Sequence, residues 1–354
     1  MIKSHIAYLA CTAAIVGTGL GAASPSSSSG DSIHVVVEGE SIQKAVDAAE
    51  PGDTVLVSPG TYRESVKVTT PGLTLRGAGR GTVIKPGRTK TANSCAAAGN
   101  GICVVGTKDE KLEDVTVSSL TVTGFAKNGV SAFGTDGLTV RNVTAVKNGV
   151  WGIAQEQSVR GVFRGNTARG NGDAGLFLAN SVTAEEGAAD TRGTVVEYNQ
   201  LEGNRIGVTV RRLRNLSVEG NHITGNCAGL FVVGDENKPR AGDLAVRENH
   251  VVENNKYCPK TERLPFLQGS GVVLTGAEKT LVTGNVIKDN AGTSPLSGGI
   301  VLFQSLVGVT SEKNRISDNE LEGNAPADLV NTDTGKGNTF ANNSCWASKP
   351  AGLC

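Results

Sequence analysis

The sequence predicts an all-β fold: a right-handed parallel β-helix made by a single chain and closed at its N-terminal end by a short capping helix. Three observations predict it, namely a repeated Asn-containing unit, the length of that unit, and an amphipathic segment near the start. In such a solenoid each coil stacks on its neighbours, so equivalent side chains of successive coils lie above one another.

The repeated unit has two Asn residues five positions apart, each three positions after an apolar residue. Gly and alternating apolar residues follow, as in Gly175-Leu-Phe-Leu178. Side chains two apart point to the same side of a strand, so one set faces the coil interior. Asn tolerates the left-handed backbone of tight turns, and stacked Asn side chains can hydrogen-bond along the solenoid axis. The clearest copies contain Asn166 and Asn171, Asn199 and Asn204, Asn221 and Asn226, Asn249 and Asn254, and Asn285 and Asn290.

The spacing of the second Asn gives the length of one coil. From Asn148 to Asn171 is 23 residues, and from Asn204 to Asn226 is 22, which suits two or three short strands separated by turns. Longer intervals elsewhere indicate coils with inserted loops. The predicted insertions are 181–192, 234–242, 255–270 and 291–298.

An open coil exposes core and strand edges, so both ends of a solenoid need covering. Residues 41–49 place Ile42, Ala45, Val46 and Ala49 on one face of a helix that Pro51-Gly52 ends. We expect this helix to cover the N-terminal end, and the tail from Cys345 to Cys354 to close the other.

The first residues are typical of an export signal. Lys3 and His5 precede an apolar run that ends at Leu20, and small residues follow. The run is short for a membrane span, and no other segment is a candidate. We therefore expect a signal peptide over 1–23, a Ser-rich linker over 24–30, and a secreted, extracellular β-helix domain over 31–354.

The cysteines agree with export. Outside the signal there are six, an even number that favours disulfides in an oxidising compartment. No Cys-x-x-Cys pair occurs and no His stands at ligand spacing, which disfavours a metal site. Proximity in sequence favours the pairs Cys95–Cys103, Cys227–Cys258 and Cys345–Cys354.

The segment from Ser41-Ile-Gln-Lys-Ala-Val-Asp-Ala-Ala-Glu-Pro-Gly-Asp-Thr-Val-Leu-Val-Ser-Pro-Gly-Thr-Tyr62 to Gly72-Leu-Thr-Leu-Arg-Gly77 resembles the first coils of the pectin-lyase-like superfamily. With the repeats, the resemblance covers nearly the whole chain after the linker. It implies the fold, but members include lyases, epimerases, hydrolases and proteins without known catalysis. The polygalacturonase motif set is incomplete, and the Asp-Pro-His of alginate epimerases is absent. The motifs therefore support neither a polygalacturonase nor an alginate epimerase.

Loops inserted on one side of a β-helix build the walls of a groove, and the four insertions flank the strands that begin at equivalent glycines. By strand parity, Phe177, Phe231 and Phe303 point outward on this face. They either stack on sugar rings or lie beneath the inserted loops. Glu156, at the groove's N-terminal edge, is a further candidate for binding sugar hydroxyls.

The central coil carries Arg211, Arg212 and Arg214, and the next insertion carries Asp235 and Glu236. Arg suits the bidentate binding of a uronate carboxylate, and the family resemblance implies that a desolvated Arg acts as the base. We assign catalysis to Arg211, Arg212, Asp235 and Glu236, and substrate binding to Arg214. The acidic side chains also suit calcium or hydrolytic catalysis, and the alternative is that all form ordinary surface ion pairs.

These observations favour a secreted polysaccharide lyase that cleaves uronic-acid-containing glycans by β-elimination. A glycoside hydrolase on the same scaffold and a non-catalytic glycan-binding or cell-envelope module are the alternatives. Lys+Arg and Asp+Glu are equal at 34 each, which argues against a general nucleic-acid binder. We expect a monomer whose partner is an acidic polysaccharide.

Overall fold

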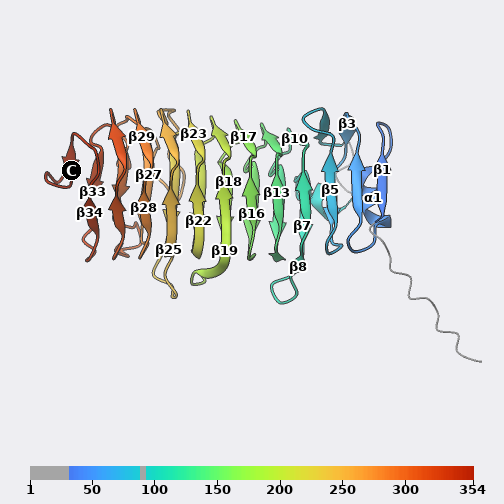
Figure 1. Cartoon of the computed structure of the whole chain (residues 1–354), viewed down its shortest axis with the longest axis horizontal. Coiled ribbons are helices and arrows are strands. Elements are labelled where there is room, and N and C mark those ends of the chain that lie inside the picture. Colours follow the sequence, from blue (N-terminus) through green and yellow to red (C-terminus); the bar gives the residue numbers. More distant parts are fainter. Residues whose placement is uncertain (1–31, 88–92) are drawn as a thin grey trace, which may run out of the picture. The chain divides into compact units, whose positions relative to one another are not determined.

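Three long parallel sheets run the length of the described chain in the computed structural model, which describes residues 32–87 and 93–354. The predicted signal peptide and linker lie outside the described residues. Every coil except the first and the last contributes one strand to each sheet in turn, and Figure 1 shows the strands following one another along the solenoid. This is the predicted parallel β-helix. No helix in the described ranges is long and apolar enough to cross a membrane.

Sheet A has 12 strands, and those in the middle of the chain are the longest. Its strands are β1 Ile33–Val36, β2 Thr54–Val57, β5 Thr74–Gly77, β9 Thr116–Ser118, β13 Thr139–Arg141, β16 Val162–Arg164, β19 Ala189–Glu197, β22 Leu213–Glu219, β25 Gly242–Arg247, β28 Leu281–Thr283, β31 Arg315–Ser317 and β34 Thr339–Ala341.

Sheet B has 10 strands, most of them three residues long between two tight turns. Its strands are β3 Gly60–Arg63, β6 Thr82–Lys85, β10 Thr121–Thr123, β14 Thr144–Val146, β17 Thr167–Arg169, β20 Gln200–Glu202, β23 His222–Thr224, β26 His250–Val252, β29 Val286–Lys288 and β32 Glu320–Glu322.

Sheet C has 11 strands and is bordered by the inserted loops. Its strands are β4 Val66–Val68, β7 Ile102–Val105, β11 Val130–Phe133, β15 Ile153–Glu156, β18 Ala174–Ala179, β21 Ile206–Arg211, β24 Ala228–Val233, β27 Ser270–Thr275, β30 Gly298–Leu302, β33 Leu329–Asn331 and β35 Ser348–Lys349. The two short strands β8 Leu112–Glu113 and β12 Thr135–Asp136 pair beside it.

One hydrophobic core fills the inside of the coils. Parallel register stacks Leu176 of β18 on Val208 of β21, and Leu230 of β24 on Val272 of β27. All four side chains have no exposed surface. The interior is thus formed by the inward row that the apolar alternation predicts.

Two ladders of buried Asn side chains line the turns. Asn221 accepts hydrogen bonds from the backbone and the side chain of Asn199, both at 2.9 Å, and donates to Asn249 at 2.9 Å. The axial bonding predicted for Asn is therefore present. The expectation that Asn itself takes the left-handed conformation is wrong, because that conformation falls on the preceding residue, such as Tyr198 (φ 53°) or Gly220 (φ 60°). The ladder Asn residues themselves do not have a positive φ, and their side-chain amides hydrogen-bond to the next coil.

The predicted capping helix is α1, Ile42–Ala48. Ser41 is its N-cap, and the carboxylate of Glu64 accepts the backbone N–H of Ile42 at 2.8 Å and of Gln43 at 3.0 Å. Ile42 and Val46 are buried in the core. The helix therefore covers the N-terminal end of the core as expected.

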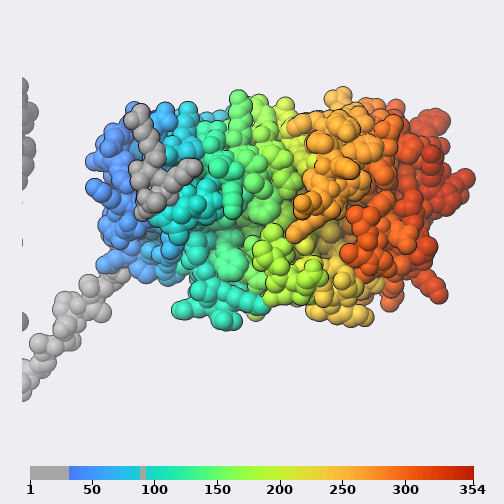
Figure 2. Space-filling model, turned by 180° about the vertical axis from the view of Figure 1, so that it is seen from behind, coloured from blue at the N-terminus to red at the C-terminus, as the bar shows by residue number. Residues whose placement is uncertain are grey.

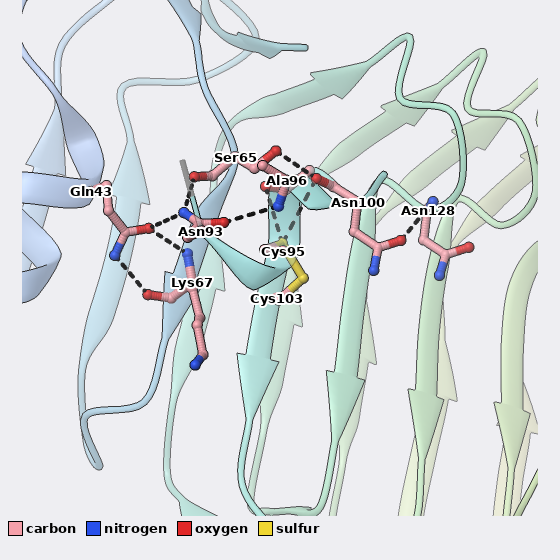
Figure 3. Close-up of a disulfide and its surroundings, with 10 residues drawn as sticks. Gln43, Ser65, Lys67, Asn93, Cys95, Ala96, Asn100, Cys103 and Asn128 are labelled. Atoms are coloured by element: carbon pink, nitrogen blue, oxygen red, sulfur yellow. Dashed lines mark hydrogen bonds between the residues drawn. A yellow bond between two sulfur atoms is a disulfide. The ribbon is translucent and has the colours of Figure 1, made fainter. Parts of the chain in front are cut away.

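The three predicted disulfides are all formed. Figure 3 shows Cys95–Cys103, which ties the short helix α2, Ser94–Ala97, to strand β7. Asn93, the N-cap of α2, also donates to the side chain of Gln43 in α1 at 3.0 Å. At the far end, Phe340 together with Cys345 and Leu353 of the disulfide-closed tail packs against the core.

The inserted loops are shorter than predicted at their edges. Residues 189–192 belong to β19, and Gly242, Ser270 and Gly298 begin strands. A further loop, 303–314 between β30 and β31, was not predicted as an insertion.

Candidate functional site

The outward row of sheet C is unusual because much of it is buried. In β18 all six residues are buried, and in β21, β24 and β27 five of six are. Phe177, Phe231, Val273 and Val301 form a second apolar cluster on the outside of the sheet. Strands buried on both faces must be covered by another layer, and here that layer consists of loops.

Two walls of loops stand on this face. The B-side wall comprises 253–269 and 289–297, which lead from sheet B into sheet C. Leu267 and Leu296 of this wall are buried in the outer cluster, and Ser297 Oγ donates to the Gln268 carbonyl at 2.6 Å. The wall is fastened by Cys227–Cys258.

The A-side wall comprises 180–188 and 234–241, which lead from sheet C into sheet A. Its two loops are joined where the Ala188 N–H donates to the Pro239 carbonyl at 2.7 Å. Figure 2 shows the B-side wall (orange) and the A-side wall (yellow-green and yellow) on opposite sides of a hollow. The groove floor is the second outward row, in which Glu156, Ala179, Arg211, Val233 and Thr275 follow in register.

The predicted aromatic row does not line this groove as exposed rings. Phe177 is 7% exposed and Phe231 is 2% exposed, because Trp151 stacks on Phe177 and both rings belong to the outer cluster with Leu267 and Leu296 of the B-side wall. Phe303 is half-buried and packs at the edge of the same cluster. The prediction that Phe177 and Phe231 stack on sugars is therefore corrected: they are the core under the B-side wall.

Arg212 and Asp235, both predicted as catalytic, bind each other within the A-side wall. The Arg212 guanidinium, whose side chain is 6% exposed, donates from Nε to the Asp235 carboxylate, whose side chain is 12% exposed. It also donates to the Ala184 carbonyl at 2.6 Å. Arg212 thereby ties the two loops of the wall together, and neither group faces the groove as a free reactant.

Arg214, predicted to bind substrate, lies in sheet A rather than on the groove face. It is part of β22, and its guanidinium pairs with Asp243 and with Glu278 at 2.8 Å. Proximity in sequence placed it near Arg211, but the chain turns from sheet C into sheet A at Arg212, which has a left-handed backbone (φ 53°). Arg214 is therefore removed from the site.

Arg211 is the central charged group of the floor. Its side chain is half-buried, and its one hydrogen bond among the described residues is a long one, 3.5 Å from Nη1 to the Val182 carbonyl. Burial lowers the pKa of Arg211, and the neighbouring cations Arg212 and Arg263 lower it further, against Asp235 and Glu185. Arg263 belongs to the B-side wall and is exposed.

Within residues 32–87 and 93–354, no carboxylate lies within ion-pairing distance of Arg211 or of Arg263, whereas Arg212 has two such partners. The floor thus presents Arg211 as a partly desolvated cation, and the B-side wall places the cation of Arg263 near it. Such a pair attracts a carboxylate and can bind it through the planar forks of the guanidinium groups.

The remaining predicted residues have lesser roles. Glu156 lies on the floor, and its Oε1 accepts the Val182 N–H at 2.8 Å, which fixes the start of the A-side wall. Glu236 is exposed on that wall. No group of three or more His, Cys, Asp or Glu able to hold a metal ion occurs among the described residues.

Sequence reasoning missed two residues of this face. Arg263 lies within a predicted insertion, whose fold over the sheet the sequence did not reveal. Trp151 precedes β15, and its ring stacks on Phe177 with centroids 4.0 Å apart. It is one of only two tryptophans in the sequence and lies two residues before β15, and this was a usable signal.

Solved structures with the same architecture include the A-modules of two mannuronan C-5 epimerases from Azotobacter vinelandii. The AlgE6 A-module is 19% identical with a TM-score of 0.59, covering 85% of this chain and 88% of that one. The AlgE4 A-module is 19% identical with a TM-score of 0.57, covering 85% and 89%. An alginate lyase from Paenibacillus is 13% identical with a TM-score of 0.50, covering 86% and 99%.

At these identities the likeness shows the fold alone. No curated protein sequence gives a significant match. The family model described as "Right handed beta helix region" matches residues 87–255 and 190–305, more than half of the chain. The parallel sheets, the Asn-lined turns and this match agree, and the chain belongs to the right-handed beta helix family.

Proposed function

We propose that the protein is a secreted enzyme that acts on uronic-acid-containing polysaccharide, and that it is a lyase cleaving by β-elimination at Arg211. The observation that carries the proposal is the half-buried Arg211 on the groove floor, which has no ion pair among the described residues and has Arg263 nearby. Three disulfides support an oxidising, extracellular location.

The chemistry assigns different tasks to the two arginines. Arg263 neutralises the uronate carboxylate, which makes the C5 proton more acidic. Arg211 accepts that proton, the C5–H electrons form the C4=C5 double bond, and the C4–O4 bond breaks as O4 takes a proton from solvent. Burial, together with Arg212 and Arg263, lowers the pKa of Arg211, which is the direction that a general base requires.

The floor disfavours a glycoside hydrolase. Hydrolysis uses two carboxyl groups that face one another across the scissile bond, about 5–9.5 Å apart. Glu156 is the one carboxylate in the described floor row from Glu156 to Thr275, and Asp235 is neutralised by Arg212. Glu156 is also two strands from Arg211, which is about 10 Å.

A non-catalytic glycan-binding module is the second candidate. The same arginines bind an acidic glycan without chemistry, and the acids near Arg211, Asp235 and Glu185, are both paired with Arg212 in the A-side wall. This candidate accounts for the cationic floor equally well. Product formation, and not binding, distinguishes the lyase from the glycan-binding module.

The test follows the ultraviolet absorbance of the unsaturated uronate product during incubation with polygalacturonate or alginate. Arg211→Ala should abolish the product, while Arg141→Ala, an exposed arginine of sheet A, should leave the rate unchanged. Reducing sugar without absorbance would indicate hydrolysis, and binding without either would indicate the module. Full activity of Arg211→Ala would refute the site.

A further inference from the structure

The groove face continues toward the N-terminus beyond both walls. Strands β11 and β15 lie there, and apart from Ala154, which is buried in the outer cluster, their outward side chains keep exposed surface. Ser131 and Glu156 are half-buried, and Phe133 is 38% exposed. Phe133 and Glu156 are in register with the floor at Arg211, so one surface joins the two regions.

Trp151 stands at the junction of this open surface with the walled groove. Its ring is nearly parallel to that of Phe177, with an interplanar angle of 6° and a centroid distance of 4.0 Å. Phe177 covers one face of the indole, and the side chain as a whole remains half-buried. The face of the indole that Phe177 covers is closed to a ligand, so a sugar ring approaches Trp151 from the opposite face or the ring edge.

The position of Trp151 is fixed by polar contacts as well as by stacking. Its Nε1–H donates to Asp173 Oδ2 at 2.9 Å. The other Asp173 oxygen lies 4.0 Å from Nε of Arg205, which is 8% exposed and donates to the Pro259 carbonyl at 2.8 Å. The indole is therefore tied through Asp173 and Arg205 to the B-side wall.

We propose that Trp151 is a sugar-stacking platform that binds a pyranose ring of the same glycan whose uronate lies at Arg211. The inference rests on the proposed function because it needs a glycan in the groove. An indole held in one orientation loses little rotamer freedom when a ring settles on it, and its face suits the C–H surface of a sugar. Arg211 lies two strands along the axis from β15, about 10 Å, and its register partner in β15, Glu156, is five residues, about 16 Å, along the strand direction from Trp151, so an oligosaccharide of several sugar residues is needed to reach both.

The test uses the emission of Trp151 in a Trp346→Phe background, where it is the remaining tryptophan of the two. Trp346 is 88% exposed in the C-terminal tail, so its replacement leaves the fold intact. Oligosaccharides from polygalacturonate and from alginate are titrated in turn. We expect one of them to shift or quench the emission with saturation. No change with either uronan would overturn the platform.

Trp151→Ala provides the affinity measurement. We expect its Kd for the active oligosaccharide to rise about tenfold, and Trp151→Phe to restore most of the affinity. Unchanged affinity of a folded Trp151→Ala would overturn the inference, and the emission titration decides the question if that variant does not fold. A Trp151 response without unsaturated product would refute the lyase and keep the platform. Unsaturated product without a change in Trp151 emission would refute the platform and keep the lyase.

Discussion

Replacing Arg212 with Met separates a structural from a catalytic role for the ion pair in the A-side wall. The substitution keeps most of the apolar length of the side chain but removes the cation from Asp235 and the donor to the Ala184 carbonyl. Breaking a buried pair costs about 3–5 kcal/mol, because one charge remains without its partner. Asp235 keeps the N–H of Asn237 at 3.1 Å, so we expect a loss near the lower end, about 3 kcal/mol.

The assay is equilibrium unfolding in urea followed by circular dichroism. Arg211→Met is the matched control, and it should cost less than about 1 kcal/mol because it breaks no ion pair among the described residues. Adding Asp235→Leu to Arg212→Met should recover much of the loss, since no charge is then left unpaired. An Arg212→Met protein of unchanged stability but without activity would refute the structural role and restore the catalytic one.

Three further outcomes are expected. Asn221→Ala should lower the free energy of unfolding by about 3 kcal/mol, because buried partners in two coils lose their hydrogen bonds, while Gln200→Ala, at an exposed amide of β20 without a side-chain hydrogen bond among the described residues, should cost less than about 1 kcal/mol in the same urea assay. Hydrogen bonds from His34 and backbone lower the pKa of Asp53 from 3.8 to about 2, so its stabilisation should be lost as pH falls from 3.8 to about 2, and acid titrations of Asp53→Asn should lack this component. Replacing both Cys227 and Cys258 by Ala should cost about 3 kcal/mol and speed proteolysis of the B-side wall, and unchanged cleavage would contradict its role as a fastener.

The repeated unit predicted the scaffold well because local patterning alone determines it. Apolar alternation gave the inward rows, and the position of Asn in each copy gave the ladders. The disulfide between Cys227 and Cys258 followed from proximity in sequence. The left-handed turn residue was misassigned because Asn, Gly and charged residues all tolerate that backbone, and the pattern does not say which of two neighbours adopts it.

The site was predicted less well because it depends on contacts between loops that share no repeat. Parity correctly turned Phe177 outward, but parity does not reveal whether a loop then covers it. Arg211 and Arg212 are adjacent in sequence, yet one lies on the floor and the other inside a wall, since the strand ends between them. Arg263 reaches the site only through the fold of its loop.

The central claim is that Arg211 acts as the base on a uronate bound in the groove. The most direct measurement follows unsaturated uronate formation from a uronan by the protein and by Arg211→Gln, and compares the affinities of both proteins for the uronan oligosaccharide. We predict that Arg211→Gln forms no unsaturated product although it still binds the acidic oligosaccharide through Arg263. Product formation at the full rate by Arg211→Gln would contradict the account.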